Sequence, residues 1–187
     1  MIGIRAFIGI DFDNDSKKYI SELQQKFRDC SVRGRWKYIG NFHLTLKFLD
    51  EITMEQKKIL DAALAEICAS TGPFSLDISD VGIFKGRESI RVLWLGLGGD
   101  IPVLRKLAEE IDRCASSLGF PAETRSYTPH ITIGQDIVFG RPFEEIKASV
   151  GKPSWGPVAV NSVELFKSEQ IRNKRVYTKI SGYKLGQ

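Results

Sequence analysis

The stretch NFHLTLKFLD, residues 41–50, contains one of the two histidines in the chain. His43 stands between apolar residues, in a segment that has the pattern of a β-strand. The second histidine, His130, lies in YTPHITIG, residues 127–134. Each histidine is followed by an apolar residue, a threonine and another apolar residue. This repetition suggests that the two segments are halves of one site.

The two segments separate polar from apolar side chains, because successive side chains of a strand point to opposite faces. In the first segment, the predicted apolar face consists of Phe42, Leu44, Leu46 and Phe48, and the predicted polar face of Asn41, His43, Thr45 and Lys47. In the second segment, His130 and Thr132 lie opposite the isoleucines. A core histidine would point with the apolar set, so we expect both histidines in a cleft together with their threonines.

The composition is that of a folded protein that does not enter a membrane. The 187 residues are 42% hydrophobic and 27% charged, which is enough to bury a core. No apolar run approaches the roughly 20 residues of a membrane span. The opening MIGIRAFIGIDFD carries Arg5 inside its apolar stretch and two acids directly after it, and therefore predicts a strand and not a signal peptide. Three widely spaced cysteines, Cys30, Cys68 and Cys114, favour a reduced, cytoplasmic protein.

The net charge of +4 is compatible with a phosphate-bearing partner without requiring one. The most basic cluster is RGRWK, residues 33–37, which we interpret as a solvated loop. A helix, a loop with basic residues and an apolar His-x-Thr strand then occur twice, with helices expected at 16–30 and about 101–118. Near the C-terminus, residues 158–168 and 175–182 are expected to be strands. No linker separates the halves, so we expect two similar lobes within a single domain, residues 1–187.

Two facing imidazoles can act as a paired base and acid near neutral pH. The hydroxyl groups of Thr45 and Thr132 can donate hydrogen bonds to phosphate oxygens and help to stabilise a pentavalent transition state. This pattern suits in-line phosphodiester chemistry. It suits acyl transfer poorly, because no serine or cysteine nucleophile accompanies either histidine. Two histidines without a cluster of cysteines or acids rarely complete a metal site, so no metal or cofactor is expected.

The sequence resembles the two-histidine phosphoesterase superfamily, and in particular the bacterial and archaeal RNA 2′,3′-cyclic phosphodiesterases, also called LigT-like or 2′-5′ RNA ligase proteins. The resemblance rests on RAFIGIDF, NFHLTLKFLDE, RVLWLGL, RSYTPHITIG and VELFKS, and covers nearly the whole chain. It implies an α+β fold of two lobes related by pseudo-twofold symmetry. Each lobe would have an antiparallel sheet facing a central cleft, with helices packed on the outside.

The resemblance also implies a reaction and its residues. Members open a ribose 2′,3′-cyclic phosphate on RNA ends or nucleotides to a 2′-phosphate without a metal, and some join or cleave 2′-5′ linkages. His43 would then be the proton donor to the leaving 3′ oxygen, and His130 the proton acceptor that activates water. These two roles could be exchanged. Thr45 and Thr132 would hold the phosphate, and the enzyme is expected to work as a monomer.

Four further residues are candidates for substrate contact. Arg125 matches a frequent family arginine, whereas Gln135 stands where members often have an arginine that approaches the nucleotide. Phe48 corresponds to an aromatic that members place against a base, although regular alternation would bury it with Phe42. Lys47 shares the predicted face of His43 and is a weaker candidate for a phosphate contact.

Three other functions fit the same pattern. The site could act on ADP-ribose 1″,2″-cyclic phosphate or on 2′-5′ oligonucleotides. The chain could also be a non-catalytic RNA-binding module whose site only grips a phosphate. Two histidines that titrate near pH 7 favour catalysis over mere binding.

Overall fold

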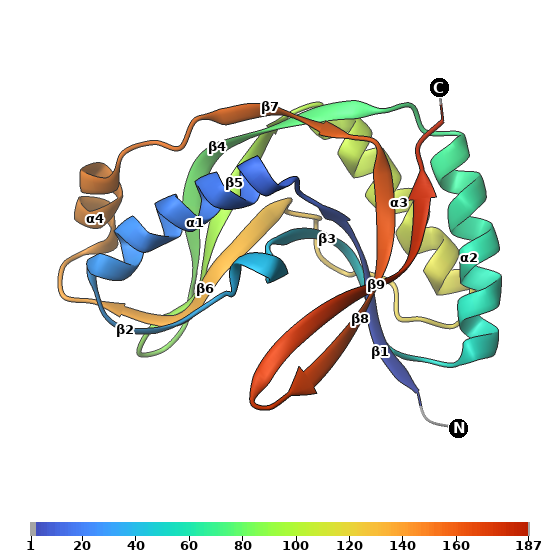
Figure 1. Cartoon of the computed structure of the whole chain (residues 1–187), viewed down its shortest axis with the longest axis horizontal. Coiled ribbons are helices and arrows are strands. Elements are labelled where there is room, and N and C mark those ends of the chain that lie inside the picture. The colour runs from blue at the N-terminus through green and yellow to red at the C-terminus, as the bar shows by residue number, and fades with distance from the viewer. Residues whose placement is uncertain (1–2, 187) are drawn as a thin grey trace.

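The computed structural model describes residues 3–186 and arranges them as two β-sheets flanked by helices (Figure 1). The elements are β1 (Ile4–Asp11), α1 (Asn14–Asp29), β2 (Ser31–Trp36), the 3-10 helix η1 (Ile39–Asn41), β3 (His43–Ile52), α2 (Met54–Ala69), β4 (Phe74–Lys85), β5 (Ile90–Gly99), α3 (Ile101–Ser117), β6 (His130–Phe139), α4 (Phe143–Val150), β7 (Trp155–Val160), β8 (Ser162–Ile171) and β9 (Lys174–Lys184). Within residues 3–186, no helix combines the length and apolar character that crossing a bilayer requires.

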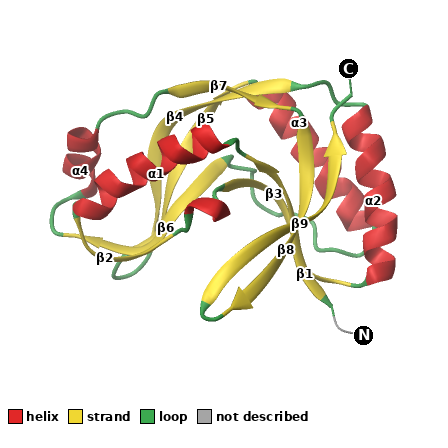
Figure 2. Cartoon of the chain, in the orientation of Figure 1, coloured by secondary structure: helices red, strands yellow, loops and turns green. Residues whose placement is uncertain are grey.

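The strand order is β3-β1-β8-β9 in the four-stranded sheet and β2-β6-β5-β4-β7 in the five-stranded sheet. All of these neighbouring strands are antiparallel. The expected α+β architecture with two antiparallel sheets is therefore confirmed (Figure 2). The strands β3 and β6, which begin at His43 and His130, contact each other between the sheets. The fold thus brings the two predicted half-sites to one place.

The helices α1 and α3 each pack on the sheet that contains the other half-site. The two helices α2 and α3 pack together, with α3 against β3 and α2 against β9 of the four-stranded sheet (Figure 1). Helix α1 instead contacts α4 and the strands β6 and β7 of the five-stranded sheet. The helix that precedes each His-x-Thr strand therefore covers the sheet of the other strand, which ties the two halves of the chain together.

Local sequence explains where the helices lie. A capping box begins α2: the Gln56 amide donates to Thr53 Oγ1 at 3.1 Å, and the Thr53 amide donates to Gln56 Oε1 at 2.9 Å. The helix expected at about 101–118 is α3, and its buried residues at helical spacing are Leu104, Leu107, Ile111 and Ala115. Because each helix buries one apolar stripe, the opposite faces of the sheets remain available for a site.

Two expectations about local structure are wrong. The RGRWK segment is not simply a solvated loop, because most of it lies in β2, which pairs with β6 at the edge of the five-stranded sheet. Residues 158–168 do not form one strand either. They divide at Asn161 between β7, which pairs with β4, and β8, which pairs with β1 in the other sheet. In both places the backbone donors and acceptors are satisfied by a partner strand distant in sequence, which local patterns do not reveal.

Candidate active site

Both histidine rings are held by the same backbone contact. Nδ1 of His43 lies 2.7 Å from the carbonyl oxygen of Asn41, and Nδ1 of His130 lies 2.7 Å from that of Thr128. A carbonyl oxygen can only accept, so Nδ1 carries the hydrogen in each ring. In the neutral ring, Nε2 is then the basic nitrogen. Each imidazole is therefore fixed in one tautomer by the carbonyl group of the residue two positions earlier.

The hydroxyl group of Thr45 lies beside its histidine. Thr45 Oγ1 is 2.8 Å from Nε2 of His43, so the hydroxyl donates to the neutral imidazole. In the other half-site, Thr132 is half-buried and lies opposite Trp94 in the pairing of β5 with β6. Among the described residues, no hydrogen bond engages Nε2 of His130. The two half-sites thus share the contact between Nδ1 and a backbone carbonyl. They differ at Nε2, which, within residues 3–186, accepts a hydrogen bond from a threonine only in the ring of His43.

Aromatic rings surround His43. The ring centroids of Phe7 and Tyr177 lie 4.5 and 5.1 Å from that of His43, and the Tyr177 ring stands almost perpendicular to it. Burial lowers the pKa of His43 to about 4, an effect that the Asn41 hydrogen bond and the nearby Asp11 carboxylate partly oppose. His43 is therefore neutral in the free cleft at pH 7.

Aromatic rings also border His130. The Phe84 ring stands perpendicular to it with the centroids 5.2 Å apart, and the Trp94 centroid lies at 6.2 Å. The indole nitrogen of Trp94 is buried and has no hydrogen-bond partner among the described residues. Sequence reasoning missed these rings, although Trp94 in the aliphatic strand RVLWLGL was a visible sign.

A charged cluster lies next to His43 across the sheet. Asp11 is the β1 partner of His43 and forms ion pairs with Lys17 at 2.7 Å and Lys179 at 2.8 Å. Burial would raise the pKa of Asp11, but the hydrogen bonds from the two lysines hold it below its usual value. Within this cluster, the Asp11 carboxylate raises the pKa of His43 and the Lys17 ammonium lowers it.

The segment before His130 is attached to the strand of His43. Tyr127 donates its hydroxyl to the backbone oxygen of Thr45 at 2.9 Å, and its own carbonyl accepts from Arg105 at 2.6 Å. Burial raises the pKa of Tyr127, so its phenol remains a donor. The two half-sites are therefore joined by a direct hydrogen bond and do not merely face each other.

A bulge in β3 corrects the predicted faces. Gly9 pairs with Thr45 and Ile8 with Lys47, which leaves Leu46 as an extra residue. Beyond this point the alternation is reversed, so Lys47 is 2% exposed and Phe48 is 64% exposed. Phe48 consequently shares the face of His43, and its expected burial is wrong.

Lys47 does not point into the cleft. Its ammonium group lies 2.5 Å from Asp112 Oδ1 on α3 and 2.5 Å from the carbonyl oxygen of Pro121. The prediction that Lys47 contacts a phosphate is therefore wrong. Instead, this buried cation ties β3 to α3 and to the segment that leads to His130.

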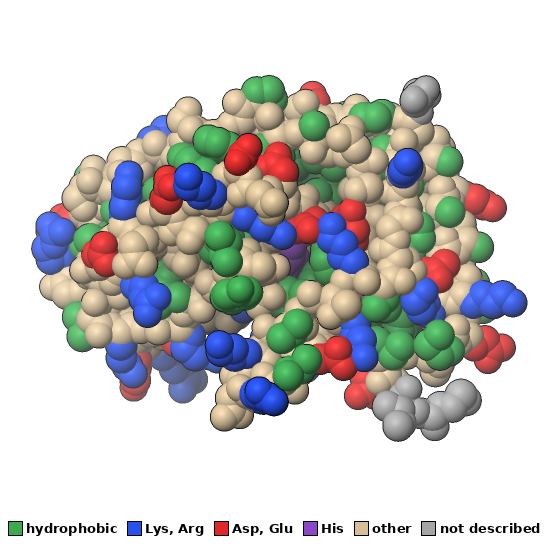
Figure 3. Space-filling view, in the orientation of Figure 1, with side chains coloured by type: hydrophobic (Ala, Val, Ile, Leu, Met, Phe, Trp, Pro, Cys, Tyr) green, Lys and Arg blue, Asp and Glu red, His purple; other side chains and the backbone are tan. Residues whose placement is uncertain are grey.

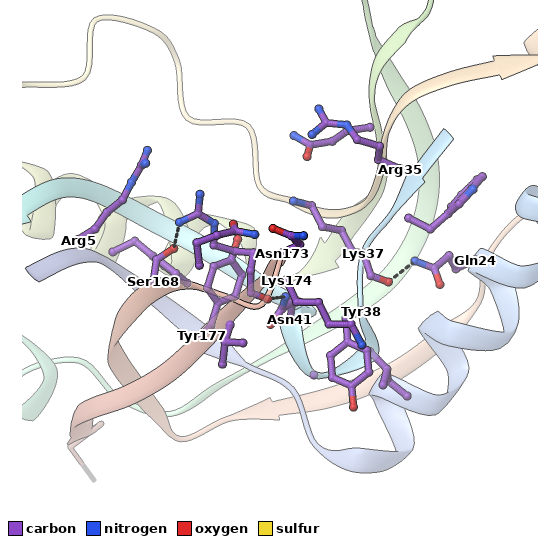
Figure 4. A pocket seen from close by; sticks show the side chains of 18 of the residues that line it. Arg5, Gln24, Arg35, Lys37, Tyr38, Asn41, Ser168, Asn173, Lys174 and Tyr177 are labelled. Carbon is purple, nitrogen blue, oxygen red and sulfur yellow. Dashed lines mark hydrogen bonds between the residues drawn. The ribbon is translucent and has the colours of Figure 1, made fainter. Parts of the chain in front are cut away.

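A groove with a volume of about 1250 Å³, seen in Figure 4, lies beside two of the rings that contact His43. Phe7 and Tyr177, which contact the His43 ring, also line it, as do Phe48 and Gln135. Arg125 lies exposed in the segment between α3 and β6 and is not part of this lining. Substrate contacts of Phe48, Gln135 and Arg125 stay predictions. Figure 3 shows histidine near the centre of one face, in a hollow bordered by acidic and basic side chains.

Within the part of the chain that the structure describes, no group of three or more His, Cys, Asp and Glu side chains is arranged to hold a metal ion. The chemistry that this site can perform with its own side chains is proton transfer by two imidazoles and hydrogen bonding by two threonines.

Similar proteins place the chain in a family. It is 31% identical to an RNA 2′,3′-cyclic phosphodiesterase of Methanocaldococcus jannaschii, over 93% of this chain and 96% of the relative. It is 29% identical to a protein of the same name from Aquifex aeolicus, over 98% of both chains. The structure of E. coli LigT complexed with 3′-AMP matches with a TM-score of 0.82 and 27% identity, over 99% of both chains. The model of the LigT-like phosphoesterases matches residues 10–94 and 100–177, and the chain therefore belongs to this family.

Proposed function

We propose that this protein opens the ribose 2′,3′-cyclic phosphate of RNA ends or nucleotides and leaves a 2′-phosphate. The observation that carries this proposal is the pair of matching half-sites, in which each imidazole has Nδ1 fixed by the carbonyl of the residue two positions earlier. The names of the similar proteins, RNA 2′,3′-cyclic phosphodiesterase, support the same substrate class.

The proposed reaction is an in-line displacement at phosphorus. His130 accepts a proton from water at its free Nε2, and the water oxygen forms a bond to phosphorus. The bond from phosphorus to the 3′ oxygen breaks, and His43 donates a proton to that oxygen. The products are a 2′-phosphate monoester and a 3′ hydroxyl, while the two histidines have exchanged protonation states and return by exchange with solvent.

The proton-donor role of His43 requires a change in its pKa on binding. Because burial lowers that pKa to about 4, few free molecules carry the proton at pH 7. The negative charge of a bound phosphodiester stabilises the imidazolium and raises the pKa. The hydroxyl of Thr45, which donates to neutral Nε2 in the free site, is then released to donate to a phosphate oxygen. In the second half-site, the Thr132 hydroxyl would likewise donate to a phosphate oxygen.

Residues 1–187 would act as one two-lobed catalytic unit, since each sheet supplies one His-Thr pair. We also propose that the enzyme works as a monomer, because one chain supplies both pairs. We also propose that the protein is cytoplasmic, because its three widely spaced cysteines favour a reducing compartment.

The test is incubation of the protein with 2′,3′-cyclic nucleotides in EDTA, followed by ³¹P NMR of the product. We expect turnover that survives EDTA and yields the 2′-phosphate alone. A 3′-phosphate product would show that the other ester bond is broken. ADP-ribose 1″,2″-cyclic phosphate and a 2′-5′-linked dinucleotide serve as competing substrates. Faster turnover of either, or binding of RNA without any turnover, would contradict the proposed function.

A further inference from the structure

The groove beside His43 has an excess of positive charge. It lies between the hairpin formed by β8 and β9 on one side and α1 with the β2–η1 segment on the other (Figure 4). Its basic lining residues are Arg5, Arg28, Arg35, Lys37, Lys174 and Arg175, and its acidic lining is Asp50 alone. An open groove of one sign of charge attracts an extended ligand of the opposite sign.

Most of this positive charge is not neutralised by the protein. Arg5 pairs with Asp50 at 3.7 Å, and Arg35 pairs with Asp136. The other four cations form no salt bridge with the described residues: Arg28, Lys37, Lys174 and Arg175. The pKa of Lys37 is lowered by burial and further by repulsion from Arg35 and Arg175. Phosphate groups along the groove would relieve this repulsion.

Aromatic side chains lie among the cations. Tyr38 is 70% exposed and Phe48 is 64% exposed, and both line the groove together with Trp36 and Tyr177. Exposed apolar rings that gather in one groove are typical of a ligand-binding surface. Alternating cations and exposed aromatic rings are the arrangement that holds single-stranded nucleic acid, because phosphates contact the cations and unpaired bases stack on the rings.

The position of the groove fits one part of an RNA substrate. A 2′,3′-cyclic phosphate can stand only at the 3′ end of a strand, so the remainder of the strand leaves the site in one direction. The groove begins at Phe7 and Tyr177, which contact the His43 ring, and continues to Lys174 at the hairpin. We propose that this groove binds the single-stranded nucleotides that precede the terminal cyclic phosphate, which makes oligonucleotides better substrates than mononucleotides. This inference rests on the proposed function.

The test compares kcat/KM for 2′,3′-cyclic AMP with kcat/KM for a ten-nucleotide single strand that ends in the cyclic phosphate. The variant Arg28→Gln/Lys174→Gln removes two exposed groove cations. The matched control is Lys58→Gln/Lys106→Gln, which removes two exposed cations on α2 and α3. We expect the ratio of oligonucleotide to mononucleotide kcat/KM to fall about tenfold in the groove variant and to stay at the wild-type value in the control.

A binding measurement makes the result independent of turnover. The probe is the same strand with a 2′-phosphate end, and its Kd is measured by fluorescence anisotropy at several salt concentrations. In the groove variant, the slope of log affinity against log salt should become less steep by about 1.4, because two phosphate contacts are lost. Failure to turn over either substrate would refute the proposed function. The salt dependence of the Kd would still show whether the groove binds the strand. Equal slopes in the wild type and the groove variant would overturn the inference, because the two cations would then make no phosphate contact.

Discussion

Tyr127 donates its hydroxyl group to the backbone oxygen of Thr45 at 2.9 Å, which joins the segment before His130 to the strand of His43. Each half-site alone has one imidazole and one threonine, so catalysis by the pair depends on their relative position. A displacement of about 1 Å can reduce a rate by about a hundredfold. This hydrogen bond therefore contributes to the alignment of the two half-sites.

Tyr127→Phe should lower kcat/KM for a 2′,3′-cyclic nucleotide by about tenfold, with a loss of about 1 kcal/mol in the free energy of unfolding. Steady-state kinetics and urea unfolding measure both effects. The control is Tyr19→Phe, because the Tyr19 hydroxyl also bonds a backbone group, the Ser154 amide at 2.8 Å, which joins α1 to the segment before β7. If both variants lower kcat/KM equally, the Tyr127 bond has no special role in alignment.

The low pKa of His43 should make stability depend on pH. The unfolded ring binds a proton below about pH 6.5, whereas the folded ring stays neutral down to about pH 4. The unfolded state therefore binds more protons in this window, so the free energy of unfolding falls as the pH decreases from 6.5 to 4. The loss should be on the order of 3 kcal/mol.

Urea unfolding between pH 7 and 4 measures this dependence in the wild type and in His43→Gln, with His130→Gln as the control. The glutamine variant at position 43 should lose most of the slope. The carboxylates whose pKa values are lowered, such as Asp11 and Asp61, contribute only at lower pH, because they titrate below their usual values. An unchanged slope in His43→Gln would show that His43 titrates normally in the folded protein.

Lys47→Met should destabilise the fold by about 3 kcal/mol, since removal of one partner leaves Asp112 with an uncompensated charge in a partly buried place. Thermal and urea unfolding are the measurements. Lys167→Met is the control, because Lys167 forms an ion pair with Glu169 in which both side chains are over a third exposed, and its loss should cost less than about 1 kcal/mol. Equal effects of the two substitutions would contradict the structural role of Lys47.

Phe48→Ala should raise KM for a cyclic nucleotide by about tenfold, because base stacking on an exposed ring contributes about 1–3 kcal/mol. Stability should change little, since the side chain is 64% exposed. Ile59→Ala on α2, which removes a side chain 50% exposed and outside the groove, is the control and should leave KM at the wild-type value. A Phe48→Ala variant with wild-type KM would exclude a contact between this ring and the base.

The sequence predicted the half-sites because each His-x-Thr pair depends only on strand alternation over a few residues. His43 and Thr45 lie before the bulge, where the period of two still holds. Lys47 and Phe48 lie after it, and both predictions of orientation failed there. The bulge is not visible in the local pattern. It accompanies the close approach of β1 and β3, where a Cβ on Gly9 would lie 2.7 Å from the carbonyl oxygen of Leu44.

The remaining features depend on contacts between segments far apart in the chain. The basic segment at residues 33–37 is a charged cluster, which locally favours a solvated loop, yet β6 supplies the hydrogen bonds that make most of it a strand. The bond from Tyr127 to Thr45 and the aromatic rings around each imidazole arise in the same way. Local propensity carries no information about such partners.

Single-turnover opening of 2′,3′-cyclic AMP in EDTA, measured for the wild type, His43→Ala, His130→Ala and the double variant, tests most directly whether the two half-sites form one catalytic site. We predict that each single variant is slower by about a thousandfold and that the double variant is little slower than either, because residues that act as a unit are not additive. A near wild-type rate in either single variant, or losses that multiply fully in the double variant, would contradict this mechanism.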